Sequence, residues 1–245
     1  LDRFRSRVIE PLDVAAAMFP VSRQVMAARV AVGLSAFNGP PIDRVRGRLH
    51  LINTFVGHDV ARPLPSFVRM IGPVRSDGNT TLGGEWRAFL DGLAKEGRGG
   101  GKDGSGNTKK KRREEKDLRV VYLAFGQNCI LLPERLRGVL SALRTLLDEG
   151  SIDGAVWSLS MTPEKYLESA GFNEPGAVPH GLKLTRFAPQ KALLASPAVR
   201  VFVSHGGAES CGESFYSGTP VLFAPHFGDQ ASNAYRLEAA GMALV

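Results

Sequence analysis

The sequence predicts an α/β protein whose larger part is a doubly wound parallel sheet. Three observations predict this fold class. Short apolar runs alternate with amphipathic stretches from residue 118 to the end of the chain, an order typical of parallel sheets covered by helices. Two consecutive runs end in glycine turns that open helical patterns. A low-complexity tract at 91–117 separates this part from an N-terminal part with its own helices and strand.

The composition is that of an ordinary globular protein, 43% hydrophobic and 22% charged. No apolar run approaches the roughly 20 residues needed to cross a bilayer, so no integral membrane segment is predicted. Cys129 and Cys211 are far apart and lack metal-ligand spacing, so neither a disulfide framework nor a metal site is expected. This cysteine usage favours a reducing, cytoplasmic location, with membrane association left open.

The net charge of +7 is unevenly distributed. Residues 1–75 hold 11 basic and 5 acidic residues and 91–117 hold 9 and 6, whereas 118–245 hold 10 and 11. The basic run Lys109–Arg113 resembles a nucleic-acid patch, but Glu114 and Glu115 follow it directly. A solvated charge run is the better interpretation, so no nucleic-acid partner is predicted.

The N-terminal part, 1–75, begins with helical periodicity over 2–37, broken at Pro11 and Pro20. A buried strand is predicted over 49–56, and an extended proline-containing run follows from Arg62 to Val74. Residues 76–117 are predicted to be an interdomain linker. Within it, 91–117 has almost no apolar content after Leu93, so we expect a disordered basic insertion.

The C-terminal part, 118–245, alternates strands and helices. The sequence LRVVYLAF at 118–125 is an apolar strand, residues 125–128 are a turn, and residues 132–148 form an amphipathic helix closed by Gly150. Further strands are predicted at 155–159, 182–184, 199–203, 221–224 and 242–245, with helices after the glycine turn at 205–207 and from Asp229 onward.

Polar residues follow the strands at 199–203 and 221–224, and parallel strands bring these ends to one edge of the sheet. A glycine turn after a buried strand lets backbone approach a ligand, and the following helix directs its free N–H groups and positive dipole end there. The favoured ligand is a phosphate. His205 and Ser210 can donate to phosphate oxygens, and Glu213, on the same helix face, suits a ribose diol.

The segment from Arg186 to Asn233 resembles the nucleotide-sugar signature of family 1, UDP-sugar-dependent glycosyltransferases, in order and spacing. That signature reads roughly W-x-P-Q, H-x-G-x-N-S-x-x-E and D-Q-x-x-N. The variant here, with Phe-Ala-Pro-Gln and His-Gly-Gly, is closer to fungal and other microbial members than to plant ones. The fold that the resemblance implies is the GT-B type, with a nucleotide-sugar Rossmann-like domain at 118–245 and the tail of a second Rossmann-like domain, which binds the acceptor, at 1–75.

The resemblance also implies the role of each site residue. Phe187 stacks on uracil, Gln190 lies near the uridine, and Glu213 holds the ribose hydroxyls. The diphosphate is held by His205, Gly206, Gly207 and Ser210, and the sugar hydroxyls by Asp229 with Gln230. Two positions depart from the pattern: Glu209 replaces Asn, and Gln127 replaces a small hydroxyl residue. We expect the Glu209 side chain to turn outward, away from the diphosphate.

Four of the candidates also have an alternative interpretation without function. Taken alone, His205 is a core histidine, Glu213 a surface residue of a helix, Asp229 an N-cap, and Phe187 a hydrophobic staple. His226 is interpreted as loop-lining. The shared spacing favours the functional interpretation for the set.

The function implied is inverting, metal-independent transfer of a hexose from a UDP-sugar, expected to be UDP-glucose, to a hydroxyl of a small lipophilic, phenolic or sterol-like acceptor. No cofactor is expected. The family places its general base near the start of the acceptor-binding domain, so the chain is expected to be a fragment that supplies donor binding without a catalytic base. Two alternatives remain: a nucleotide-sugar binding module without turnover, and a nucleic-acid-associated protein that acts through the basic tract.

Overall fold

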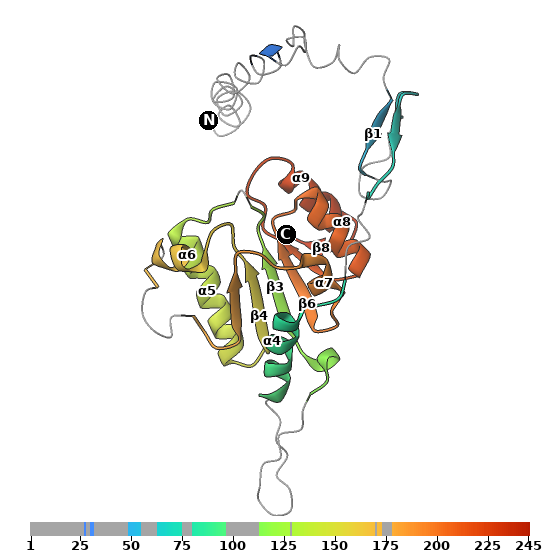
Figure 1. Ribbon diagram of the computed structural model, residues 1–245. Helices are drawn as coiled ribbons and strands as arrows, with labels where there is room; N and C mark the ends of the chain where they lie inside the picture. The colour runs from blue at the N-terminus through green and yellow to red at the C-terminus, as the bar shows by residue number, and fades with distance from the viewer. Residues whose placement is uncertain are drawn as a thin grey trace, which may run out of the picture. The chain divides into compact units, whose positions relative to one another are not determined.

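Figure 1 shows the computed structural model of the chain. The structure describes residues 27, 30–31, 49–54, 63–74, 80–96, 113–127, 129–169, 171–172 and 178–245. The chain divides into two compact units, Leu1–Leu51 with Leu64–Arg69, and Ile52–Pro63 with Met70–Val245. The helices predicted over 2–37 lie outside the described residues, apart from three helical positions at 27, 30 and 31.

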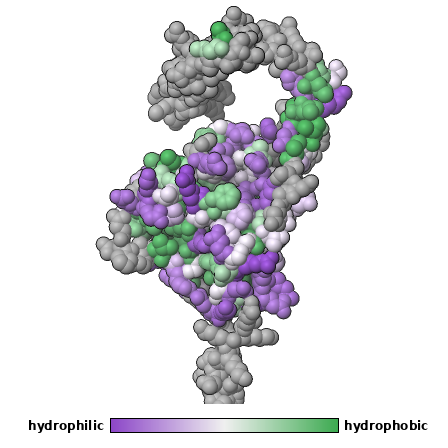
Figure 2. Space-filling view, in the orientation of Figure 1, coloured by the Kyte–Doolittle hydropathy of each residue, from purple (hydrophilic) through white to green (hydrophobic). Residues whose placement is uncertain are grey.

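A small two-stranded sheet precedes the main fold. It pairs β1 (His50–Ile52) with β2 (Val68–Met70), and the His50 amide donates to the Phe67 carbonyl at 2.7 Å. β1 lies within the strand predicted over 49–56, but Leu51 and Ile52 are exposed, so the predicted burial of this strand is wrong. Figure 2 shows hydrophobic side chains gathered on this sheet, where Leu49 and Leu51 are both exposed.

The main sheet has six parallel strands in the order β5-β4-β3-β6-β7-β8. Numbered from its first strand, this is the 3-2-1-4-5-6 order of a doubly wound Rossmann-like sheet. The structure therefore confirms the fold class predicted for this part. Its strands are β3 (Val120–Ala124), β4 (Gly154–Ser158), β5 (Leu182–Thr185), β6 (Val199–Ser204), β7 (Val221–Phe223) and β8 (Ala243–Leu244).

Helices cover the two faces of this sheet and bury two apolar clusters (Figure 1). One cluster joins β3, β6 and β7 to α4 (Gly84–Lys95), α7 (Gln190–Ala195), α8 (Ala208–Ser217) and α9 (Gln230–Ala239). The other joins β3 and β4 to α5 (Pro133–Asp148) and α6 (Pro163–Ser169). Alternate residues of β3 supply both clusters, since Tyr122 faces the first and Leu123 the second.

The helix α4 corrects the expectation that residues 76–117 are a linker. It lies within that stretch and buries Trp86, Leu90 and Leu93 in the first apolar cluster. Residues 115–117 form a short 3₁₀ helix, η2 (Glu115–Asp117), so the disordered insertion predicted over 91–117 is wrong at both of its ends. Residues 97–112 lie outside the described residues.

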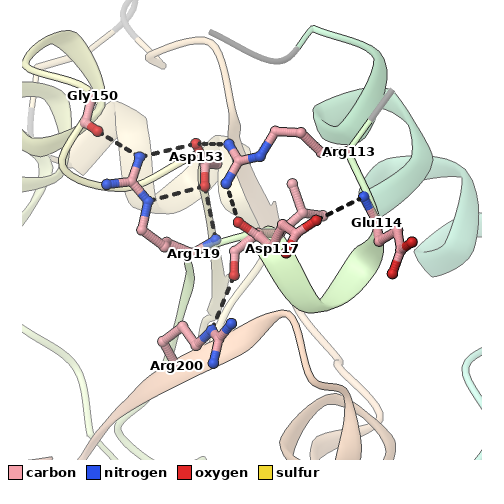
Figure 3. Close-up of polar contacts among 8 residues, drawn as sticks. Arg113, Glu114, Asp117, Arg119, Gly150, Asp153 and Arg200 are labelled. Carbon is pink, nitrogen blue, oxygen red and sulfur yellow. Dashed lines mark hydrogen bonds and ion pairs between the residues drawn. The ribbon is translucent and has the colours of Figure 1, made fainter. Parts of the chain in front are cut away.

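A charged cluster ties this stretch to the amino edge of the main sheet (Figure 3). The buried Asp153 carboxylate, just before β4, pairs with Arg113 at 2.6 Å and Arg119 at 3.2 Å. Burial acts to raise the pKa of Asp153, but hydrogen bonds from the two guanidinium groups outweigh it and hold that pKa below its ordinary value. The cluster fixes Arg113 to the fold, although the sequence placed it in a disordered tract.

Candidate functional site

The candidate site lies at the carboxyl edge of the main sheet, where β3 and β6 are neighbours and the strand order reverses. Ligands of doubly wound sheets bind at this switch point. The turn after β3 contains Gly126 and the turn after β6 contains His205. A Cβ atom added to Gly126 would lie 2.9 Å from His205 Nε2, so the two turns touch. The predicted site residues therefore lie at the edge where a nucleotide is expected.

His205 lies between two glycines that leave room for its ring. A Cβ atom on Gly207 would lie only 2.6 Å from His205 Nε2. The buried Nδ1 atom has no hydrogen-bond partner among the described residues. Burial lowers the pKa of His205, against opposing effects of the Ala124 backbone and the Asp229 carboxylate. Burial therefore favours the neutral form of the ring.

The glycine turn after β6 packs against the start of α9. Gly206 has a φ of +87°, and a Cβ atom there would lie 2.9 Å from the Gln230 carbonyl oxygen. The Asn233 amide donates to the Gly206 carbonyl at 3.0 Å and to the Asp229 carboxylate at 2.9 Å. Asn233 thus joins the predicted diphosphate-binding turn to the predicted sugar-binding carboxylate.

A second group of predicted residues is joined by direct hydrogen bonds between α7 and α8. Gln190 Nε2 donates to Ser210 Oγ at 3.2 Å and to Glu213 Oε2 at 2.7 Å. Its Oε1 accepts from the Tyr122 hydroxyl of β3 at 3.1 Å. Lys191 Nζ lies 3.8 Å from Glu213 Oε1. The predicted uridine and ribose residues are thus organised around one carboxylate.

Other predicted residues lie at the rim of the site. Phe187 is 75% exposed, so its ring is open for stacking and is not a buried hydrophobic staple. Asp229 occupies the N-cap position of α9 but makes no side-chain capping bond within the described residues. Glu209 is exposed, as expected for a side chain that turns outward, and Gln127 is exposed as well.

Gln230 has a local structural role in the turn between β7 and α9. It is only 4% exposed, and its Oε1 accepts from the backbone amides of His226 and Phe227 at 2.8 and 3.0 Å. The oxygen expected near a sugar hydroxyl is therefore engaged in holding the loop. The loop in turn places the neighbouring Asp229.

His226 lines this loop, as expected, and packs its ring edge-to-face on Phe125 at 5.4 Å. Its buried Nε2 has no partner within the described part of the chain. Burial lowers the pKa of His226, and so do the positive charge of Arg135 and, when it is protonated, the His205 ring. The two imidazoles thus disfavour each other's charged forms.

A cavity of about 680 Å³ lies elsewhere, beside α4, η2 and the end of α7. Its lining includes Leu118 and Pro197, which precede β3 and β6, so it opens at the amino edge of the sheet. A smaller cavity, of about 240 Å³, is lined by Lys191 and Glu213. We place the functional site at the carboxyl edge because the switch point, the N-terminus of α8 and the unpaired His205 nitrogen meet there.

Three residues around the site were not assigned from the sequence: Tyr122, Lys191 and Asn233. Asn233 had a usable signal, because it lies four residues after Asp229 in a helix and therefore on the same face. Tyr122 is a single hydroxyl in an apolar strand, and Lys191 is one lysine among many. Only the tertiary packing shows their partners.

No helix among the described residues is long and apolar enough to span a bilayer. Within the same residues, no group of three or more His, Cys, Asp or Glu side chains is placed to hold a metal ion.

Comparison with known proteins supports the same assignment. The chain is 32% identical over 197 residues to a UDP-glycosyltransferase of Phaeomoniella chlamydospora, which covers 80% of this chain and 36% of that protein. It is 31% identical over 225 residues to a UDP-glycosyltransferase of Talaromyces amestolkiae, and the match covers 84% of this chain and 37% of that protein. The UDP-glycosyltransferase stmC of Aspergillus ustus is 28% identical over 256 residues, covering 97% and 43%. The chain therefore spans less than half the length of these fungal relatives.

A solved structure shares the fold. The crystal structure of the glycotransferase of kitacinnamycin matches with a TM-score of 0.53 at 18% identity, over 99% of this chain and 53% of that one. A sequence model of the UDP-glucoronosyl and UDP-glucosyl transferase family matches residues 117–245, which contain every predicted site residue. The chain belongs to this family of UDP-sugar-dependent glycosyltransferases.

Proposed function

We propose that this chain binds a UDP-sugar, with UDP-glucose as the expected donor, and stabilises the departing UDP while a hexose passes to an acceptor hydroxyl. The observation that carries the proposal is the His205 ring at the N-terminus of α8. It is held between Gly126 and Gly207 and has a buried nitrogen without a partner among the described residues. A diphosphate there would meet the free amides and the positive dipole end of α8.

The surrounding residues divide the ligand between them. Glu213 and Gln190 are proposed to hold the ribose and uridine, and Phe187 to stack on uracil. Asp229 is proposed to meet the sugar, with Gln230 holding the loop that places it. Fixed amide dipoles and His205 would stabilise the negative charge that develops on the leaving diphosphate. We propose that the transfer inverts the configuration at the anomeric carbon, that it needs no metal ion or cofactor, and that the acceptor is a small lipophilic, phenolic or sterol-like molecule.

Thermal unfolding with UDP tests donor binding. At a hundredfold excess over Kd, a ligand that binds only the folded state contributes about 2.7 kcal/mol, which raises Tm by roughly 5–10 °C in a chain of this size. His205→Gln should lose most of this shift. His180→Gln is the matched control, because His180 is exposed and precedes β5 at the opposite edge. A folded chain whose Tm does not respond to saturating UDP contradicts the proposal.

Turnover is tested separately, because a binding module would pass the first test. The chain is incubated with UDP-glucose and a panel of phenols and sterols, and glycosides are detected by mass spectrometry. The resemblance assigns proton removal from the acceptor to a histidine of the acceptor-binding domain, and we match none of the five histidines here to it. General-base assistance typically contributes about 10²–10⁴-fold. We therefore expect donor binding with little transfer, and robust multiple turnover would show that the base is present.

The nucleic-acid alternative rests on the basic run that ends at Arg113. In the structure, Arg113 is engaged with Asp153 at 2.6 Å and is thus not available as a free cation. Binding through such a run would weaken steeply as salt increases. We expect no salt-dependent retention of an oligonucleotide at physiological ionic strength.

We predict a cytoplasmic location from the cysteine usage, because two cysteines without disulfide or metal-ligand spacing favour a reducing compartment. Cys129 and Cys211 are both buried and unpaired in the structure.

A further inference from the structure

A buried tyrosine connects the core of the sheet to the proposed ribose-binding carboxylate. Tyr122, on β3, is 1% exposed and stacks on Phe202 of β6 with ring centroids 5.1 Å apart. Its hydroxyl donates to Gln190 Oε1 at 3.1 Å, and Gln190 Nε2 donates to Glu213 Oε2 at 2.7 Å. The chain of contacts therefore runs from the centre of the core to a side chain at the site.

The Gln190 amide is held at both of its ends. The Glu213 carboxylate only accepts hydrogen bonds, so the NH₂ group must face α8 and the amide oxygen must face β3. The Tyr122 hydroxyl, which can donate or accept, donates to this oxygen. Removing the hydroxyl would leave the amide oxygen without this donor, and the amide would be held only from the Glu213 side.

Glu213 retains acceptor capacity after these contacts. A carboxylate offers about four lone-pair sites. In the structure, Gln190 uses one on Oε2, and Lys191 lies 3.8 Å from Oε1. The remaining sites match the two hydroxyl donors of a vicinal diol. The side chain is 11% exposed, so it is aligned by the fold and still reachable.

The Tyr122 hydroxyl is a proton donor at physiological pH. Burial and the negative charge of Glu213 raise its pKa well above the ordinary value, against a smaller effect of Ser158. It therefore remains protonated and continues to donate to Gln190.

We infer that Tyr122 is a positioning residue of the donor site, which acts through Gln190 to align Glu213 with the two ribose hydroxyls of the nucleotide. The inference rests on the proposed function, since it assumes that UDP is bound at Glu213. It assigns to a core residue a role in recognising ribose rather than in folding alone.

The test compares the affinities of the full chain for UDP and for 2′,3′-dideoxy-UDP, measured by calorimetry. The wild-type chain should prefer UDP by about tenfold or more, as expected for hydrogen bonds to a charged group. Tyr122→Phe keeps the stacked ring and removes the hydroxyl. It should weaken UDP about three- to tenfold, the range of a neutral hydrogen bond, and leave the dideoxy analogue unchanged.

Tyr166→Phe is the matched control. Tyr166 is buried in the other apolar cluster, and its hydroxyl accepts from the Leu131 amide at 3.0 Å. This control should leave the preference for UDP intact. A second variant, Gln190→Met, breaks the same connection without altering Tyr122, and it must reduce the preference even if Tyr122→Phe fails to fold. In a Glu213→Ala background, Tyr122→Phe should have no further effect.

The outcomes separate this inference from the proposed function. Suppose that the wild-type chain prefers UDP over the dideoxy analogue. If the Tyr122→Phe variant, or Gln190→Met in its place, keeps this full preference, the positioning role is overturned and donor binding stands. If the wild-type chain binds both nucleotides equally, the role of Glu213 in recognising ribose is overturned together with that of Tyr122. If it binds neither, the proposed function itself is wrong.

Discussion

Replacing Gly206 by alanine tests the geometry of the turn that faces the diphosphate. At a φ of +87°, an alanine costs about 1–2 kcal/mol because its Cβ approaches the backbone. The same Cβ would lie 2.9 Å from the Gln230 carbonyl oxygen, a backbone atom that cannot rotate away. Overpacking of this kind typically adds about 1–3 kcal/mol. Gly206→Ala should therefore lower the free energy of unfolding by about 2–5 kcal/mol.

Gly218→Ala separates the two contributions. Gly218 ends α8 with a φ of +68°, and a Cβ atom there would meet nothing within 4 Å. This control should cost only about 1–2 kcal/mol. Urea unfolding of both variants measures the difference, with UDP affinity as a second readout that only Gly206→Ala should weaken. Equal costs for the two variants would show that the turn after β6 and the start of α9 are not in close contact.

Three further perturbations have defined outcomes. Glu213→Ala should weaken the affinity for UDP, measured by calorimetry, by about 10- to 100-fold. Glu238→Ala, on the exposed face of α9, should leave this affinity unchanged. Equal effects of the two substitutions would reject the assignment of Glu213 to the ribose. Because the pKa of His205 is lowered, the free energy of unfolding should fall as pH drops below the unfolded value of about 6.5. Affinity for UDP-glucose, whose phosphates do not titrate in this range, should rise as His205 gains its proton. His205→Gln should reduce the slope of both pH profiles, while His226, whose pKa is also lowered, keeps part of the slope of the stability profile; unchanged slopes would contradict the assignment. Deleting 97–112 should change the free energy of unfolding by less than about 0.5 kcal/mol, because the Arg113 amide already donates to the Ala94 carbonyl at 3.2 Å and the two flanking ends therefore lie close together. Deleting 95–116 also removes the ion pair between Arg113 and Asp153 and should cost about 1–3 kcal/mol in urea unfolding. A large cost for the shorter deletion would show that residues 97–112 pack on the fold.

The strands and the glycine turns could be predicted because their signals are local. An apolar run such as 118–125 predicts a strand, and a glycine such as Gly150 or Gly218 predicts the end of a helix, from neighbouring residues only. Helix α4 was missed because its neighbours misled the prediction. Its apolar residues Trp86 and Leu90 stand at the border of a glycine-rich charged tract, and composition averaged over that tract hides a short amphipathic face.

The site could be predicted as a set of residues but not as a network. Spacing indicated that Gln190, Ser210 and Glu213 act together. It could not show that Tyr122, 68 positions before Gln190, donates to the oxygen of its amide. Nor could it show that Gln230 uses its oxygen to hold the loop before α9. Hydrogen bonds between distant elements depend on how the helices pack on the sheet, which periodicity does not encode.

Photoaffinity labelling with 5-azido-UDP-glucose tests the location of the donor site most directly, since its reactive group is on the uracil ring. We expect labelling of the peptide that contains Phe187, dependent on light and suppressed by excess UDP. The cavity at the amino edge, lined by Arg87 and Glu115, is the competing location. Labelling confined to the peptides around that cavity, with Phe187 unmodified, would show that the donor does not bind at the carboxyl edge of the sheet.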